Sequence, residues 1–299
     1  MALQRHPVAT LASGGQISLY VHEVVGSGDG PTFGLCGGVH GDEPVGVEIL
    51  WRFAERLQQL KFRGRVLMAP VANPLALEGR TRHSPLDMLN FNRTYPGDAS
   101  GWVTERLAAA FHTHFLDHLD AMIDFHAGGY WPTVDYVYIV NAEDLSRAFG
   151  SPLLYRTSPN RPGPRPGRIK TVTVELGGGP VDQTAYVRRG VQGIENVMHA
   201  LGMLDGPPAP APAQTVVNEL VYIRPKHGGL MVSEAKVLGA PIAGGDVLGR
   251  VVSPYTFETL ETIRSPFPKG IMILSHLTVN VVQPGDFGYM VGNLEGATS

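Results

Sequence analysis

The chain has 299 residues, of which 43% are hydrophobic and 17% charged, and its formal net charge is −3. This length suffices for one large domain or two ordinary ones, and the composition is that of a globular protein. The near-neutral charge and the lack of a Lys/Arg run argue against a nucleic-acid partner, because phosphate backbones are bound by basic surfaces. Apolar stretches such as Gly270–Leu274 are too short to span a bilayer, and the N-terminal segment lacks a signal peptide's apolar core. Together with a single cysteine, Cys36, these features predict a cytoplasmic protein without internal disulfides or membrane contact.

Up to residue 204, apolar strand-like runs alternate with amphipathic helical patterns. Helices are predicted over Pro44–Leu57 and Thr104–Leu119, and a long polar loop over Asn73–Gly97. The runs that predict strands are Ile17–Val25, Thr32–Cys36, Arg65–Ala69, Ala121–Phe125, Val134–Val140 and Thr171–Glu175. This alternation predicts an α/β fold, with a mainly parallel mixed sheet and helices on both faces.

The segment Asp205–Gln214, DGPPAPAPAQ, favours an extended connector over a packed element. We therefore expect domains at 1–204 and 215–299 on either side of this linker. The second half consists of short apolar runs separated by Gly and Pro, which predict a smaller all-β domain. Its hairpins resemble those of lipoyl carriers, but the turn at Tyr255–Glu258 has no lysine to modify. We expect this domain instead to cover the mouth of the active site or to support subunit contacts. Whether the protein forms a homo-oligomer is left open by the sequence.

The segment Leu35–Pro44, LCGGVHGDEP, carries the strongest sign of chemistry. An apolar strand runs into glycines, and His40 and Glu43 follow three residues apart, before a helix opened by Pro44. Glycines such as Gly41 permit the close backbone approach that a strand-to-helix loop at an active site needs. Two histidines and one glutamate form a catalytic zinc ligand set that leaves one coordination position open. This pattern therefore predicts a zinc site that needs one more histidine.

Two further residues stand in the same strand-then-glycine context. His126 follows the apolar run Ala121–Phe125, and Glu175 ends the run Thr171–Glu175 just before three glycines. Ligands of open α/β sheets bind at the carboxyl ends of the strands. We therefore expect His126 to complete the zinc site and Glu175 to lie beside it.

The loop Asn73–Gly97 offers groups that bind anions. Arg80, Arg82 and Arg93 can each bind a carboxylate bidentately, and Asn92 can add an amide donor. Structureless loops of this length are usually functional or disordered, and the apolar residues inside this one argue against disorder.

The motifs HGDE, NFNRTYPG, DFH and VELGGG occur in this order. Together they resemble the succinylglutamate desuccinylase and aspartoacylase family of the zinc carboxypeptidase superfamily, and the form is most similar to the N-acetyl-diaminobutyrate deacetylases. The resemblance covers the whole chain. It implies a zinc carboxypeptidase-like fold, a C-terminal β domain, and one zinc ion per chain held by His40, Glu43 and His126.

The resemblance also implies an activity, hydrolysis of the amide bond of a small N-acyl amino acid. Glu175 is then the general base and acid, and Asn92 with Arg93 forms a clamp on the substrate carboxylate. We expect the Arg93 guanidinium to be buried, so that substrates without a carboxylate bind poorly. Arg82 matches best the arginine that polarises the scissile carbonyl, with Arg80 as a substitute.

The sequence departs from the family pattern at two places. The common DLNR motif is NFNR here, so Asn90 stands where an aspartate often steadies the clamp. A substrate-binding tyrosine of the aspartoacylase branch has no clear counterpart, and Tyr130, Tyr186 and Tyr289 are the candidates. The acyl and side-chain specificity therefore stays open.

Two other functions use the same residues. A carboxypeptidase would need an open groove, which the long loop and the β domain are expected to wall off. A metal-dependent binding protein would not need the general base Glu175. A second histidine pair, His114 and His118, falls on the stripe of Leu107, so we interpret both as partly buried packing residues.

Overall fold

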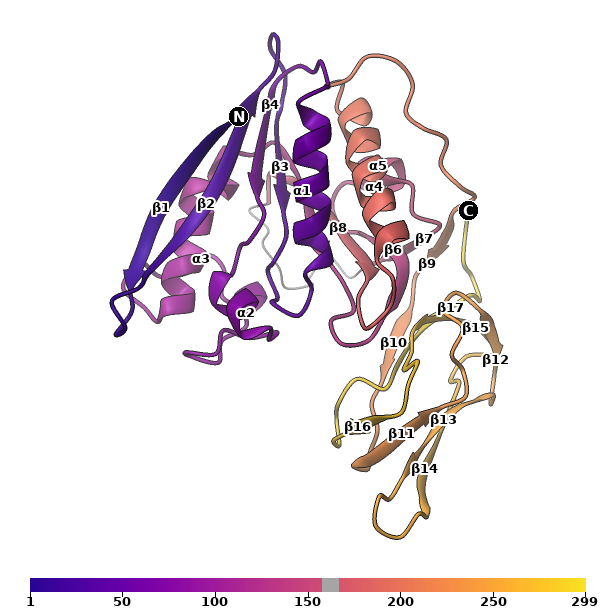
Figure 1. Cartoon of the computed structure of the whole chain (residues 1–299). Helices are drawn as coiled ribbons and strands as arrows, with labels where there is room; N and C mark the ends of the chain where they lie inside the picture. The colour runs from indigo at the N-terminus through magenta and orange to yellow at the C-terminus, as the bar shows by residue number, and fades with distance from the viewer. Residues whose placement is uncertain (158–166) are drawn as a thin grey trace.

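The computed structural model describes residues 1–157 and 167–299. A mixed sheet of 13 strands runs through the molecule, in the order β1-β2-β4-β3-β5-β8-β6-β15-β17-β10, with β12 beside β15 and with β7 and β9 extending from β6. A separate four-stranded sheet has the order β14-β13-β11-β16. Figure 1 shows the larger α/β part above and the C-terminal strands below it. The predicted fold class, a mixed α/β sheet followed by antiparallel β structure, is confirmed.

Strands and helices alternate along the α/β part. The strands are β1 (Ala2–Thr10), β2 (Gln16–Val25), β3 (Thr32–Cys36), β4 (Arg65–Ala69), β5 (Ala121–His126), β6 (Thr133–Ile139), β7 (Leu153–Arg156) and β8 (Lys170–Gly177). The helices are α1 (Val45–Leu57), α2 (Pro74–Gly79), α3 (Val103–His114), α4 (Glu143–Phe149) and α5 (Thr184–Ala200), with short 3₁₀ turns η1 (Phe91–Arg93) and η2 (Leu116–His118). All six predicted strands are present, each within two residues of its predicted ends.

The C-terminal part contributes nine strands. They are β9 (Thr215–Val217), β10 (Leu220–Ile223), β11 (Gly229–Ser233), β12 (Pro241–Ala243), β13 (Val247–Val252), β14 (Thr259–Arg264), β15 (Lys269–Leu274), β16 (Asn280–Val282) and β17 (Tyr289–Asn293). The first of them, β9, pairs with β7 of the α/β part, and β15 meets β6 at Leu274 and Thr133. The chain has no helix or strand over 205–214, as expected of a connector, and the division into two domains there stays a prediction.

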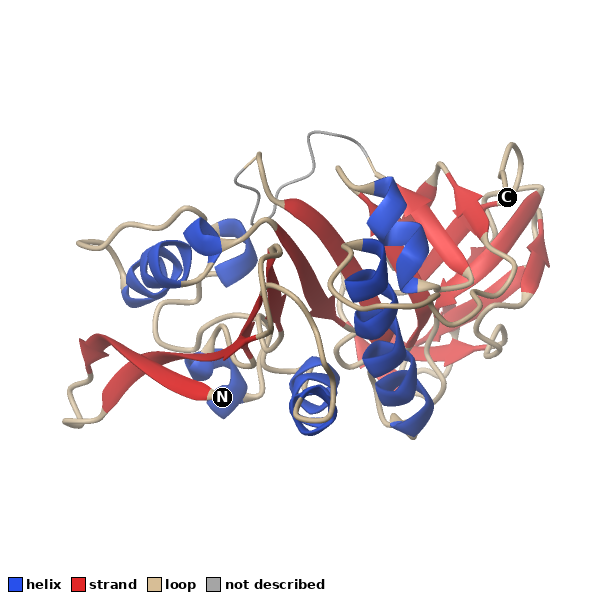
Figure 2. Ribbon diagram, turned by 90° about the horizontal axis from the view of Figure 1, so that it is seen from above, coloured by secondary structure: helices blue, strands red, loops and turns tan. Residues whose placement is uncertain are grey.

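Parallel pairing is confined to two stretches of the large sheet. The central strands β4, β3, β5 and β8 are parallel neighbours, and so are β6, β7 and β9, whereas the remaining pairs are antiparallel. Side chains alternate between the faces of the sheet, so that Ile123 and Phe125 pack in one core with α1, α4 and α5. Met122 packs in a second core with α3. Helices thus cover both faces, as Figure 2 shows. Asp124 and His126 alternate with Ile123 and Phe125 along β5, so they face the same side as Met122, the side of α3.

Two predicted segments differ from the structure. The helix predicted to reach Leu119 ends at His114, because the backbone of Phe115 leaves the helical region with φ −129° and ψ −64°, and the turn η2 follows. The loop 73–97, predicted to lack secondary structure, contains α2, capped by the side chain of Asn73, and η1. No helix of the described residues has the length and apolar character that a bilayer crossing requires.

Candidate active site

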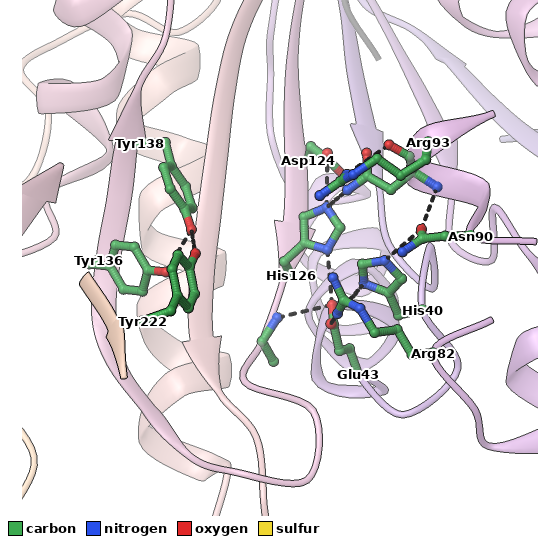
Figure 3. A network of polar contacts seen from close by, with 12 residues as sticks. His40, Glu43, Arg82, Asn90, Arg93, Asp124, His126, Tyr136, Tyr138 and Tyr222 are labelled. Carbon is green, nitrogen blue, oxygen red and sulfur yellow. Dashed lines mark hydrogen bonds and ion pairs between the residues drawn. The ribbon is translucent and has the colours of Figure 1, made fainter. Parts of the chain in front are cut away.

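Three side chains meet where β3 and β5 end. His40 and Glu43 lie in the turn between β3 and α1, and His126 is the last residue of β5. The Nδ1 atom of His40 lies 2.8 Å from Glu43 Oε1, and Nδ1 of His126 lies 2.9 Å from Glu43 Oε2. All three residues are at most 4% exposed. The structure therefore brings the three predicted zinc ligands together in one buried cluster (Figure 3).

The turn that carries His40 and Glu43 depends on a close backbone approach. A Cβ atom on Gly41 would lie 1.7 Å from the carbonyl oxygen of Ala76 in α2, so only glycine fits there. The Gly41 amide donates to the carbonyl of Thr81, which ties the turn to the long loop. The expectation that Gly41 serves close packing is confirmed.

The two histidines present the same ring nitrogen to Glu43 because their other nitrogens are engaged. His126 Nε2 lies 3.1 Å from Oδ2 of Asp124, which as a carboxylate can only accept a hydrogen bond. His40 Nε2 lies 3.3 Å from Oδ1 of Asn90. A neutral ring that donates through Nε2 directs its Nδ1 lone pair toward Glu43, which is the arrangement usual for metal-binding histidines.

This donor set fits a zinc ion. The ligand atoms of the cluster all lie within 4.8 Å of one another, close to the spacing of about 3.3–4.2 Å for atoms sharing one zinc. With both rings neutral and protonated on Nε2, two nitrogen lone pairs and the Glu43 carboxylate would converge on one point, where a cation could accept all three. His40, Glu43 and His126 are therefore the residues that could hold the ion.

Strong electrostatic coupling marks the same cluster. Burial acts to raise the pKa of Glu43, but His40 and His126 outweigh it and hold that pKa well below its usual range. Burial likewise acts to lower the pKa of His126, yet the carboxylates of Asp124 and Glu43 raise it well above the ordinary histidine value. The site is thus built to keep Glu43 ionised in a buried position.

Glu175 lies in the middle of a row that crosses three strands. On β8 it is the register partner of His126 on β5 and of Tyr136 on β6, so the three side chains leave the same face of the sheet. Burial, and then the nearby charge of Glu175, raise the pKa of Tyr136 well above its usual value. The predicted base therefore stands between the candidate metal site and a tyrosine.

A cavity of about 420 Å³ opens over this row. It is lined by His40, Glu43, Arg82, Asn92, Arg93, His126, Ala127, Gly128, Thr133, Tyr136, Tyr138, Tyr155, Thr157, Glu175, Tyr222, Arg224, Leu274, Phe287 and Met290. The three candidate metal ligands, Arg82 and Arg93 lie together at one end (Figure 3). The tyrosines lie across from them in Figure 3, joined by contacts of 2.8 Å between the hydroxyls of Tyr136 and Tyr138 and 3.5 Å between those of Tyr138 and Tyr222.

Three of the four loop residues predicted to bind substrate line the cavity, and the fourth does not. Arg82 Nη1 donates to Glu43 Oε1 at 3.2 Å, and Asn92 Nδ2 lies 3.4 Å from His126 Nε2, so both sit against the metal site. Arg93 lines the cavity and donates to the carbonyl of Asn92 at 2.9 Å. Arg80 is exposed at the end of α2 and does not line the cavity.

The expectation of a buried Arg93 is wrong, because the residue is exposed at the rim of the cavity. The reason is local: Arg93 ends the short turn η1, whose buried residue is Phe91. A substrate carboxylate would therefore meet Arg93 at the entrance of the cavity rather than deep inside it.

The tyrosine candidates do not line this cavity. Tyr289 is fully buried in the core of the C-terminal part, and the hydroxyl of Tyr186 donates to the carbonyl of Thr133. Tyr130 borders a different cavity, of about 600 Å³. Sequence reasoning missed, among others, the cavity residues Tyr136, Tyr138, Tyr155 and Tyr222, the partner Asp124 of His126, and the contact of Asn90 with His40. Residues two apart in a strand lie on the same face of the sheet, so the sequence could have indicated that Asp124 lies beside His126.

The interpretation of the second histidine pair is correct for one member only. His114 is half-buried and stacks on His6 with ring centroids 4.0 Å apart. His118 lies beyond the end of α3 and is exposed, because the helix stops before it. Neither belongs to the one group of three metal-ligand side chains found among residues 1–157 and 167–299.

Comparisons with known proteins agree with this geometry. Residues 29–156, which include the three candidate ligands, match the model of the succinylglutamate desuccinylase/aspartoacylase catalytic domain. A relative from Halomonas elongata, N-alpha-acetyl-L-2,4-diaminobutyric acid deacetylase, is 31% identical over 255 residues, with 76% of this chain and 72% of the relative covered. The chain belongs to the succinylglutamate desuccinylase/aspartoacylase family.

Solved structures of the family share the whole architecture. A succinylglutamate desuccinylase from Silicibacter sp. TM1040 superposes with a TM-score of 0.84 at 25% identity, covering 97% of this chain and 94% of that one. The product-bound ectoine utilization protein EutE (DoeB) from Ruegeria pomeroyi gives a TM-score of 0.81 at 25% identity and covers 97% and 93%. A family protein from Shewanella amazonensis, at 18% identity and a TM-score of 0.85, is similar in fold.

Proposed function

We propose that this protein is a zinc-dependent hydrolase that cleaves the amide bond of a small N-acyl amino acid, releasing a carboxylic acid and the free amino acid. The observation that carries the proposal is the convergence of His40, Glu43 and His126 beside Glu175 in one cavity. The name of the Halomonas relative, a deacetylase of an N-acetylated amino acid, supports the substrate class.

The chemistry divides between the ion and the chain. A zinc ion in the cluster would lower the pKa of a water molecule toward 7 and polarise a carbonyl oxygen. Glu175 then accepts a proton from the attacking water and delivers it to the amide nitrogen as the carbon–nitrogen bond breaks. Arg82 donates hydrogen bonds to the carbonyl oxygen as negative charge develops there.

Orientation of the substrate is the second task of the chain. Arg93 and Asn92 hold its free carboxylate at the edge of the metal site, so that the amide carbon lies over Glu175. The remaining part of the substrate extends toward the tyrosine hydroxyls. Because Tyr222, Phe287 and other C-terminal residues wall this end, the cavity suits a small molecule better than a peptide, which disfavours the carboxypeptidase alternative.

The decisive experiment combines metal analysis with a substrate panel. The purified protein is expected to hold one zinc ion per chain and to release free amine from N-acyl amino acids with different acyl groups and side chains. Peptides and N-acyl amines without a carboxylate serve as controls. A protein that holds zinc but hydrolyses peptides faster than every N-acyl amino acid would be a peptidase, and the proposal would be wrong.

A further inference from the structure

The side-chain oxygen of Asn90 touches two functional parts of the site at once. Oδ1 lies 3.3 Å from Nε2 of His40 and accepts a hydrogen bond of 2.9 Å from the backbone amide of Asn92. The second bond caps η1, the turn that carries Asn92 and Arg93. One atom thus connects a candidate metal ligand to the candidate substrate clamp (Figure 3).

The backbone amide fixes the protonation pattern of this contact. A main-chain N–H can only donate, so the Asn90 atom facing Asn92 must be the carbonyl oxygen and not the amide nitrogen. The same oxygen lies 3.3 Å from Nε2 of His40 and can only accept, so a hydrogen bond between them requires a proton on Nε2. In the neutral ring the lone pair is then on Nδ1, which faces Glu43 at 2.8 Å and lies 3.3 Å from Arg82 Nη1, an atom that can only donate.

We propose that Asn90 is a positioning residue that couples metal binding to substrate binding. Its oxygen selects the metal-binding tautomer of His40 and, through the cap, sets the position of Asn92 and Arg93. This inference rests on the proposed function, because both roles matter only if the cluster binds zinc and the turn binds a carboxylate.

The two histidines differ in the partner behind them. His126 has a carboxylate, Asp124, two residues earlier in the same strand, whereas His40 has the neutral amide of a residue fifty positions later. Loss of such a supporting partner typically weakens metal affinity about 10- to 100-fold. A neutral partner supports the ring less strongly than a charged one, so an aspartate at position 90 is expected to hold zinc at least as tightly.

Three substitutions separate the two roles. Asn90→Asp keeps an oxygen that can reach both groups. Asn90→Ser keeps a good helix cap but is too short to reach His40, and Asn90→Ala removes both contacts. A matched control is Thr94→Val, which removes the 2.8 Å hydrogen bond from the Thr94 hydroxyl to the Asn90 carbonyl in the same turn without touching His40.

Zinc affinity, measured by chelator competition, is the first readout. The dissociation constant is expected to rise about 10- to 100-fold in Asn90→Ser and Asn90→Ala and to stay at or below the wild-type value in Asn90→Asp. Thr94→Val is expected to bind zinc like the wild type. Circular dichroism and thermal melting of the metal-free proteins check that each variant is folded.

The KM at saturating zinc is the second readout. We expect KM for an N-acyl amino acid to rise about fivefold in Asn90→Ala, where the cap is lost, and to stay within about twofold of wild type in Asn90→Ser. Wild-type zinc affinity in Asn90→Ser would overturn the tautomer role, and equal KM values for Ser and Ala would overturn the coupling. If the wild type itself binds no zinc, the proposed function fails instead.

Discussion

The two parts of the chain contribute different kinds of side chain to one cavity. The α/β part provides the candidate metal ligands, the base Glu175 and the arginines Arg82 and Arg93. The C-terminal part provides Tyr222, Arg224, Leu274, Phe287 and Met290. No acidic side chain of the described C-terminal residues lines the cavity, and Arg224 lies over the Phe287 ring at 4.6 Å.

The groups that would carry out the reaction are thus distinct from the groups that bound the far end of the substrate. His126 and Glu175 are fixed by the register of β5 and β8, whereas the other charged groups lie in the turn after β3 and in the loop 73–97. The far end of the substrate is bounded by residues of the C-terminal part together with Tyr136 and Tyr138 of β6. Substitutions in the first set are therefore expected to change kcat, and substitutions in the second to change KM and substrate preference.

The largest expected effect is that of Glu175→Gln. The change keeps the size and hydrogen bonding of the side chain but removes the group that accepts the proton, so turnover should fall by about 10²–10⁴ or more. Zinc content and folding should stay near wild type. His126→Ala is the contrast, because losing one of three ligands should release the ion itself. Wild-type turnover by a zinc-loaded Glu175→Gln protein would remove Glu175 from the mechanism.

Arg82→Ala and Arg80→Ala form a matched pair two positions apart. Arg82 lies against Glu43, so its removal should lower kcat about 10²–10³-fold, the usual cost of losing a donor to a developing negative charge. Arg80 is exposed and outside the cavity, so its removal should leave kcat within about twofold, as expected for a solvated arginine. If steady-state kinetics showed the larger loss of kcat in Arg80→Ala, Arg80 and not Arg82 would be the residue that polarises the carbonyl.

Arg93→Ala tests the clamp at the rim. A charge-assisted hydrogen bond contributes about 1.5–3 kcal/mol, so KM for N-acyl amino acids should rise roughly 10- to 100-fold. N-acyl amines that lack the carboxylate should be hydrolysed equally by both proteins. An equal loss on both substrate types would mean that Arg93 supports the loop rather than the substrate.

Tyr222→Phe should have the smallest effect and should appear in KM alone. The substitution removes one hydroxyl from the wall, worth about 0.5–1.5 kcal/mol if it bonds the substrate, which corresponds to a two- to tenfold rise in KM. Tyr255→Phe, on a 90% exposed residue of a distant hairpin, is the control and should change nothing. A drop in kcat with unchanged KM would contradict the division between the two parts.

The metal site was predictable because its signals are local. His40 and His126 each follow an apolar run and stand within two residues of a glycine, Glu43 is three residues from His40, and the parallel strands β3 and β5 bring their ends together. The tyrosine wall was not predictable in the same way. Tyr136 and Tyr138 are two residues apart on β6 and share one face, as in any strand. Only the fold decides that this face meets the C-terminal strand that carries Tyr222.

Helix α5 and strand β1 show how packing overrides local preference. Gly190 and Gly193 weaken the helical pattern by about 1 kcal/mol each, yet a Cβ there would lie within 2.5 Å of Ile49 and 2.3 Å of Phe149. The glycines are required by neighbours that are remote in sequence. In β1, Pro7 argues against a strand, but it lies at the sheet edge beside a register shift, where proline is tolerated.

The row of His126, Glu175 and Tyr136 sets the length of substrate that fits between the metal site and the tyrosine wall. Neighbouring strands are held about 4.8 Å apart by their hydrogen bonds, so the backbone distance from metal ligand to wall is fixed at roughly 10 Å. Backbone hydrogen bonds between Gly128 and Gly177 and between Gly179 and Gly129 lock the ends of this row. Substrate length can then evolve only through the size of the side chains at the wall. Libraries randomised at positions 136, 138 and 222 should shift acyl-chain length while leaving the bond-breaking step intact.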